Sequence, residues 1–144
     1  GALPGLQDLI DGLKSRARDS RPFRTWGGRV YYCEEAKFME GRWRTFDYKM
    51  VNYLIQGSSA DITKQALIEY HRAKKHGRIV LCVHDEICIS CPTEHWQAEM
   101  EILRSCMEGI KLDCKLLSDG EVGYNWHDLV SENQYDVLAK ETSN

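Results

Sequence analysis

The stretch Ile79-Val80-Leu81-Cys82-Val83-His84-Asp85-Glu86-Ile87-Cys88-Ile89-Ser90-Cys91 decides how the chain folds. Valine, isoleucine, leucine and cysteine fill both sides of its centre, a composition typical of two short buried strands. The centre, His84-Asp85-Glu86, predicts a tight hairpin that places two carboxylates at the edge of a sheet, because an isolated carboxylate is too costly to bury in an apolar layer. A solvated turn and a carboxylate hairpin that carries a metal ion both fit this stretch.

Length and composition indicate a single globular domain. The chain has 144 residues, of which 42% are hydrophobic and 28% charged, enough to bury a core of ordinary size. No apolar run reaches the length of about 18 residues that spans a bilayer, so the sequence predicts no membrane partner. The start, Gly1-Ala2-Leu3-Pro4, has neither an initiator methionine nor a signal-peptide layout, and we expect it to be a cut or processed end.

The net charge of −3 by itself argues against a nucleic-acid-binding protein, but the charges are unevenly distributed. Residues 1–49 hold ten Lys/Arg against seven Asp/Glu, whereas residues 50–144 hold nine against fifteen. The segment 14–29 is the most basic, with Asp19 as its only acidic residue and these cations: Lys14, Arg16, Arg18, Arg21, Arg24 and Arg29. It is either a basic arm that grips phosphates or a solvated helix face, and composition leaves both open.

Six cysteines lie at positions 33, 82, 88, 91, 106 and 114. Three fall within the predicted strand pair and one in a predicted helix, which indicates free, buried thiols in a reducing compartment. Cys88 and Cys91, near His84 and His95, also suggest zinc. Their spacing points the two thiols to opposite faces of a strand, and no second cysteine pair matches it, so a zinc-bound structural domain is disfavoured.

Hydrophobic periodicity and turn residues predict the other elements. The predicted order is a helix over 3–18, a short strand over 30–33, a loop or hairpin over 34–46, a long helix over 47–75, the hairpin described above, a helix over 94–109 and a strand over 115–118. This order predicts an α+β fold, in which helices back an antiparallel sheet that carries the strand–turn–strand carboxylate hairpin.

Two features of the long helix suggest more than packing. Asn52 and Gln56 are four residues apart, so both amides project from one face, as binding groups or as simple surface polarity. The small residues 57–60 allow another element to come close, which would compensate for a glycine inside a helix. Upstream, the Gly27-Gly28 turn presents Arg29 at the start of a strand, where its guanidinium could meet a phosphate or a base edge.

These residues resemble the C-terminal palm of family A DNA polymerases, the group of DNA polymerase I and the bacteriophage replicative polymerases. The resemblance rests first on Asn52-x3-Gln56-Gly57-Ser58-Ser59-Ala60-Asp61-Ile62-x-Lys64 followed by Val83-His84-Asp85-Glu86. Thr25-x-x-Gly28-Arg29 and Gly120-x-x-Gly123-x-Asn125-Trp126 are similar to two further segments of the family. The resemblance runs in the family's order from about residue 3 to residue 128.

The resemblance implies a magnesium-dependent site. In the family, the aspartate of the H-D-E motif is one of two carboxylates that hold paired Mg²⁺ ions, which assigns this role to Asp85, with Glu86 as an auxiliary or outer ligand. One ion lowers the pKa of the primer 3′-hydroxyl and the other neutralises the leaving pyrophosphate. His84 would position the hairpin near the primer end.

The same resemblance implies contacts with primer–template DNA. Arg29, Asn52 and Gln56 would reach the minor groove, whose purine N3 and pyrimidine O2 acceptors are shared by all base pairs. Many cellular members carry arginine four positions before the asparagine. Here Tyr48 stands there with Lys49 beside it, so this contact is either vacant or made by Lys49. Variation at this point is more typical of the bacteriophage branch.

Two segments of the family have no match in this chain: D-Y-S-x-I-E-x-R, which supplies the second metal-binding aspartate, and the R-x3-K-x6-Y-G fingers helix, which binds the incoming dNTP. We therefore expect residues 1–130 to be the C-terminal part of a palm, followed by a polar tail at 131–144. Activity would require an N-terminal polymerase fragment, and dNTP would bind only with its fingers. The uncovered apolar surface would favour self-association. The implied location is the cytoplasm of a bacterial or phage-infected cell.

A different functional class also fits the sequence. The chain could be a non-catalytic module that binds duplex DNA through the basic segment 14–29. Such a module would bind DNA in a salt-dependent way, without any effect of Mg²⁺ or of Asp85→Asn.

Overall fold

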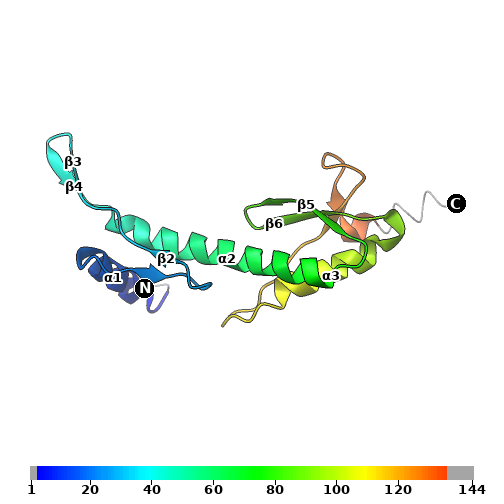
Figure 1. Ribbon diagram of the computed structural model, residues 1–144, viewed down its shortest axis with the longest axis horizontal. Coiled ribbons are helices and arrows are strands. Elements are labelled where there is room, and N and C mark those ends of the chain that lie inside the picture. Colours follow the sequence, from blue (N-terminus) through cyan, green and yellow to red (C-terminus); the bar gives the residue numbers. More distant parts are fainter. Residues whose placement is uncertain (1–2, 136–144) are drawn as a thin grey trace. The chain divides into compact units, whose positions relative to one another are not determined.

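The computed structural model describes residues 3–135. Their contacts divide the described chain into two compact units. The first comprises the residues up to Gln65 together with Val83–Glu86, and the second comprises Ala66–Cys82 together with the described residues from Ile87 onward. Figure 1 shows the elements of both units in chain order.

The first unit is built on a small aromatic core. Its elements are α1 (Leu6–Arg18), β1 (Phe23–Arg24), β2 (Val30–Tyr31), β3 (Lys37–Met39), β4 (Arg42–Arg44), the 3₁₀ turn η1 (Asp47–Lys49) and the first part of α2 (Met50–Ala73). Leu13, Phe23 and Met50 are buried together, and the ring of Tyr31 stacks between those of Phe23 and Tyr53, with centroid distances of 5.6 and 5.9 Å. This core fixes α1 and the β1–β2 ribbon on the N-terminal half of α2.

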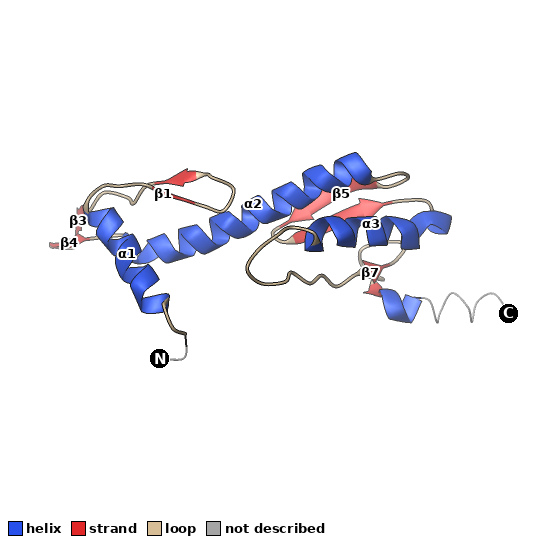
Figure 2. Cartoon of the chain, turned by 90° about the horizontal axis from the view of Figure 1, so that it is seen from below, coloured by secondary structure: helices blue, strands red, loops and turns tan. Residues whose placement is uncertain are grey.

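The second unit packs two helices against one hairpin, as Figure 2 shows. Its elements are the end of α2, most of β5 (Arg78–Val83) and β6 (Glu86–Ser90), the 3₁₀ turn η2 (Thr93–His95), α3 (Trp96–Glu108), β7 (Glu121–Val122) and β8 (Val130–Ser131). Ala66 and Tyr70 from α2 meet Ile87 from β6 and Leu103 from α3 in one buried cluster. The hairpin that carries His84 and Asp85 is thereby held from its base.

α2 is the longest helix, with 24 residues, and it matches the long helix predicted from the sequence. Asp61, Lys64, Glu69 and Arg72 interrupt its apolar residues. Accordingly, no helix within residues 3–135 is long and apolar enough to cross a membrane.

Within residues 3–135 the strands form four two-stranded sheets, with orders β1-β2, β3-β4, β5-β6 and β7-β8. The predicted α+β class with antiparallel pairing is confirmed, but the strands do not join into one sheet. The strand predicted over 115–118 is wrong. There, the backbone N–H and the hydroxyl of Ser118 both donate to the Glu108 carboxylate, at 2.8 and 3.0 Å, and Leu117 is largely exposed. The Glu108 carboxylate thus accepts the backbone hydrogen bond that a neighbouring strand would otherwise accept.

The prediction that both arms of the central hairpin are buried is correct for one arm only. Ile87 in β6 is buried, whereas Val80, Leu81 and Val83 in β5 are 60%, 38% and 37% exposed. α2 and α3 pack on Ile79 of β5, and Val80 lies on the opposite face of the ribbon. Leu81 and Val83 share the face of Ile79 but lie nearer the turn, outside the packed cluster, so they also stay exposed.

All six cysteines are free. Cys33, Cys88, Cys91 and Cys106 are half-buried, and burial raises the pKa of the thiols of Cys33, Cys91 and Cys106. Cys82 and Cys114 are exposed, so the burial expected for the cysteines of the strand pair is wrong for Cys82.

Candidate nucleic-acid and metal site

The turn from Thr25 to Arg29 is closed by its own hydrogen bonds. The backbone N–H of Thr25 donates to the carbonyl of Arg29 at 2.9 Å, and that of Gly28 donates to the carbonyl of Thr25 at 3.0 Å. The N–H of Arg29 donates to Oγ1 of Thr25 at 3.1 Å. Gly28 has a φ of 84°, a conformation that glycine adopts without strain. The T-x-x-G-R pattern thus specifies a rigid turn.

This turn is fastened to α2 through Asp61, which accepts three hydrogen bonds from it. A guanidinium NH₂ of Arg29 donates to Oδ1 at 2.6 Å, the N–H of Gly27 donates to Oδ2 at 3.3 Å, and the hydroxyl of Thr25 also donates to Oδ2. We call Thr25, Gly27, Arg29 and Asp61 the Asp61 clamp. It joins two of the sequence segments on which the family resemblance rests.

Close approach of the turn to the helix depends on two glycines. A Cβ on Gly27 would lie 2.8 Å from Cβ of Asp61, and a Cβ on Gly57 would lie 2.8 Å from Cγ2 of Thr25. Both distances are too short for any other residue without displacement of the turn. The expectation that the small residues of the long helix admit a neighbouring element therefore holds at Gly57.

Burial of Asp61 acts to raise its pKa, but the hydrogen bonds from Thr25 and Arg29 outweigh burial, and the pKa is lowered. Its side chain is 10% exposed, whereas that of Arg29 is 41% exposed. The sequence predicts a DNA contact for Arg29, and that contact stays a prediction. The structure gives the same guanidinium a second role, since it holds the turn on α2.

Replacing Asp61 with alanine is expected to destabilise the first unit by about 1–3 kcal/mol, because the hydroxyl of the buried Thr25 loses its acceptor. Asp19→Ala is the matched control, since its side chain is 53% exposed in an ion pair with Arg21 and exposed pairs contribute about 0–1 kcal/mol. Thermal unfolding followed by circular dichroism measures both. Equal losses for the two variants would show that the clamp contributes no more than a surface ion pair.

Asn52 and Gln56 are both exposed on α2, where the sequence places them on one face of the helix. Lys49 lies next to this face but is engaged: its Nζ donates to Glu34 at 2.9 Å and lies 4.6 Å from the centroid of the Phe46 ring. The hydrogen bond to Glu34 raises the pKa of Lys49. A DNA contact by Lys49 would have to compete with Glu34.

The basic segment 14–29 is also partly engaged within the chain. Arg16 and Arg24 donate to the carbonyls of Pro22 and Gly28, at 3.3 and 2.9 Å. Arg21 and Arg29 form ion pairs with Asp19 and Asp61. A basic arm that binds DNA would therefore have fewer available cations than composition suggests.

The carboxylate hairpin has the tight turn that the sequence predicts. His84 and Asp85 form a two-residue turn between β5 and β6, and Glu86 is the first residue of β6. His84 has a φ of 53°, as required at the turns of tight hairpins. All three side chains are exposed, and they belong to the same compact unit as Asn52 and Gln56.

The carboxylates of Asp85 and Glu86 offer the hard oxygen ligands that Mg²⁺ prefers, at a position open to solvent. Among residues 3–135 there is no group of three or more His, Cys, Asp or Glu side chains placed to hold a metal ion. The two residues thus fit part of a magnesium ligand set, to which further ligands must be added.

A model of the protein family described as "DNA polymerase family A" matches residues 2–128. The chain belongs to this family. The match includes the Asp61 clamp, the Asn52–Gln56 face of α2 and the carboxylate hairpin.

Individual relatives agree with the family assignment. This family A chain is 31% identical to DNA polymerase theta of Caenorhabditis elegans over 131 residues, which cover 88% of the chain and 8% of the relative. It is 30% identical to DNA polymerase I of Chloroflexus aurantiacus over 132 residues, or 88% of the chain and 14% of the relative. It is 31% identical to DNA polymerase I of Caldicellulosiruptor bescii over 131 residues, which cover 87% of the chain and 15% of the relative. The chain spans less than one sixth of these curated relatives.

A solved structure shares the fold. It is described as the POL domain of Pol1 from M. smegmatis in complex with DNA primer-template and dNTP. The TM-score is 0.67 and the identity 28%, over 78% of this chain and 21% of that chain. Because the match covers most of this chain but only 21% of the other, this chain corresponds to a portion of that polymerase domain.

Proposed function

We propose that this chain contributes part of the palm of a template-directed DNA polymerase. Asp85 would be one of the two carboxylates that hold Mg²⁺, with Glu86 as an outer ligand and His84 beside the primer end. The observation that carries the proposal is the exposed His84-Asp85 turn, which belongs to the same compact unit as the exposed Asn52 and Gln56 side chains. One unit would then present both metal ligands and duplex contacts.

The side chains fit these roles chemically. When bound, the magnesium ions would activate the primer 3′-hydroxyl and neutralise the leaving pyrophosphate. The amides of Asn52 and Gln56 can donate to the minor-groove acceptors that all base pairs share, which binds a duplex without reading its sequence. The Asp61 clamp would keep Arg29 in a fixed position on α2, where the exposed part of its guanidinium can reach the same groove.

The chain would need a complementary polymerase segment. The pair Asp85 and Glu86 leaves the ligand set incomplete, and the sequence has no match to the segments that supply the second aspartate and the dNTP-binding fingers. The exposed apolar side chains of Val80, Leu81 and Val83 in β5 offer a surface for such a segment or for self-association. Tyr48, in place of the arginine of many cellular members, is the ground for placing the chain nearer the bacteriophage branch.

Reconstitution tests the proposal. We expect no primer extension from this chain alone, and Mg²⁺-dependent extension once it is mixed with a family A fragment that carries the second aspartate and the fingers helix. The measurement is gel analysis of a labelled primer on a longer template, with each component omitted in turn. Extension by the chain alone would contradict the proposed incompleteness. Duplex binding that ignores Mg²⁺, without any extension after mixing, would favour the non-catalytic DNA-binding module.

A further inference from the structure

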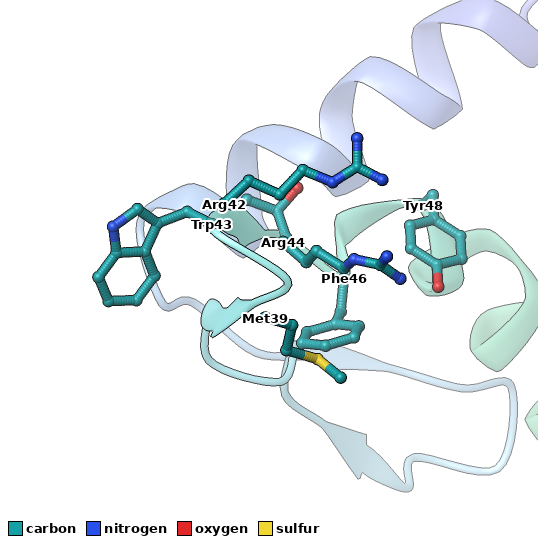
Figure 3. A pocket seen from close by; sticks show the side chains of 7 residues that line it. Met39, Arg42, Trp43, Arg44, Phe46 and Tyr48 are labelled. Carbon is teal, nitrogen blue, oxygen red and sulfur yellow. The ribbon is translucent and has the colours of Figure 1, made fainter.

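A cavity of about 420 Å³ opens beside the β3–β4 hairpin, within the first unit. Its lining consists of Met39, Arg42, Trp43, Arg44, Thr45, Phe46 and Tyr48 (Figure 3). This volume lies within the range of about 300–1,000 Å³ found for small-ligand sites. None of the roles proposed above uses this cavity.

The cavity carries positive charge that the protein itself does not neutralise. Two arginines line it, Arg42 and Arg44. Arg42 is exposed and forms no ion pair with any residue in the described part of the chain. Arg44 pairs with Glu40, yet its Nε–H is buried without an acceptor among the described residues. Figure 3 shows both side chains extending toward the side on which Tyr48 lies. An anionic occupant would complete these contacts.

The same cavity has aromatic walls. Tyr48 is 65% exposed, and Phe46 is half-buried beneath the ammonium group of Lys49. Alternation along the strands puts Trp43 and its cross-strand partner Phe38 on the other face of the hairpin, where their rings meet edge-to-face at 5.7 Å. Phe38 is 62% exposed. Trp43 is among the lining residues although its ring projects away from the others, so Tyr48 supplies the exposed aromatic ring on the cavity side. Tyr32, which is 63% exposed, lies outside the lining.

We propose that this cavity binds a nucleotide of single-stranded DNA. Arg42 and Arg44 contact the phosphate, and the ring of Tyr48 stacks on the base. Cations combined with exposed aromatic rings are the usual means of binding single strands, and in a duplex the base faces are already stacked on one another. Only the identity of the strand rests on the proposed function: in a polymerase it is the unpaired template.

Fluorescence anisotropy of the full chain with a labelled oligothymidine of about 12 nucleotides tests this assignment. Tyr48→Ala is expected to weaken binding by about fivefold or more, whereas Tyr32→Ala, which removes a similarly exposed tyrosine outside the cavity, changes it less than about twofold. Arg42→Ala is expected to reduce the slope of log affinity against log salt by about 0.7, with Arg72→Ala, an exposed arginine on α2, leaving it unchanged. Circular dichroism confirms that each variant is folded.

Three results would overturn the assignment. Binding that Tyr48→Ala leaves intact, or that Tyr32→Ala weakens equally, would show that the cavity does not take part in the interaction. Preference of the wild-type chain for a blunt duplex over the oligothymidine shows that base stacking is not the basis of binding. Absence of binding, together with self-association that Tyr48→Ala relieves, makes the cavity an interface between copies. Primer extension by the reconstituted polymerase is a separate measurement that does not depend on this cavity. A negative result for single-strand binding therefore leaves the proposed function to be tested by primer extension.

Discussion

Replacing Glu99 with alanine is expected to lower the free energy of unfolding by at least about 3 kcal/mol. Glu99 and Tyr70 are both fully buried. The Tyr70 hydroxyl donates to Oε2 of Glu99 at 2.6 Å, and the backbone N–H groups of Lys75 and His76 donate to Oε1 at 2.9 and 2.6 Å. One carboxylate thus satisfies donors from α2 and from the segment that leads into β5. Its removal leaves a buried hydroxyl without an acceptor and opens a cavity.

Glu101→Ala on the same helix is the control. Its side chain is 68% exposed in an ion pair with Arg104 at 3.3 Å, so we expect a loss below about 1 kcal/mol. Urea titrations monitored by circular dichroism give both values. Similar losses for the two glutamates would mean that Glu99 does not join α2 to the start of β5.

The same residue predicts a dependence of stability on pH. Burial acts to raise the pKa of Glu99, but the hydrogen bonds from Tyr70, His76 and Lys75 outweigh it and lower the pKa from 4.5 to about 2. Between these values the unfolded chain binds more protons than the folded chain, so stability falls as pH falls from about 4.5 toward 2. Glu99→Gln keeps the size of the side chain and removes the titration. The difference between wild type and Glu99→Gln should therefore shrink over this interval.

The sequence pattern was sufficient to predict the helix and the hairpin that carry the candidate site. Two apolar runs on either side of His84-Asp85-Glu86 predicted the hairpin and its turn, and the spacing of Asn52 and Gln56 predicted their shared face. These features are local, since each depends on residues fewer than ten positions apart. The burial of the β5 arm was predicted incorrectly because local composition does not reveal how many faces of a strand find a partner.

Contacts between residues far apart in the sequence could not be predicted from hydrophobic periodicity. Asp61 and Arg29 are 32 positions apart, and nothing in their spacing identifies them as partners. Glu99 was missed although a signal existed: it lies four residues before the buried Leu103, which places it on the same face of α3. A charged residue on a buried face is informative, because it requires buried donors. The strand predicted over 115–118 was wrong for a related reason, since the distant Glu108 carboxylate accepts the hydrogen bonds of Ser118.

The largest effect that we expect on activity is that of Asp85→Ala in the reconstituted polymerase. Asp85 is exposed at the tip of the hairpin, so its replacement would remove the proposed metal-binding carboxylate without opening a cavity. A catalytic metal ion supplies several kcal/mol of transition-state stabilisation, and each 1.4 kcal/mol corresponds to about a tenfold change in rate. We therefore expect primer extension to fall by at least about 100-fold.

Asp113→Ala is the matched control, because Asp113 is also an exposed carboxylate in a connecting segment, outside every site proposed above. Duplex DNA affinity should stay the same in both variants, since Asn52 and Gln56 are unchanged.

The most direct test of the central claim is the rate of Mg²⁺-dependent primer extension by this chain, mixed with the complementary polymerase fragment, with Asp85 present or replaced. The account predicts that Asp85→Ala abolishes extension while Asp113→Ala retains it at the wild-type rate. Extension by Asp85→Ala at the wild-type rate would contradict the assignment of Asp85 as a metal-binding carboxylate.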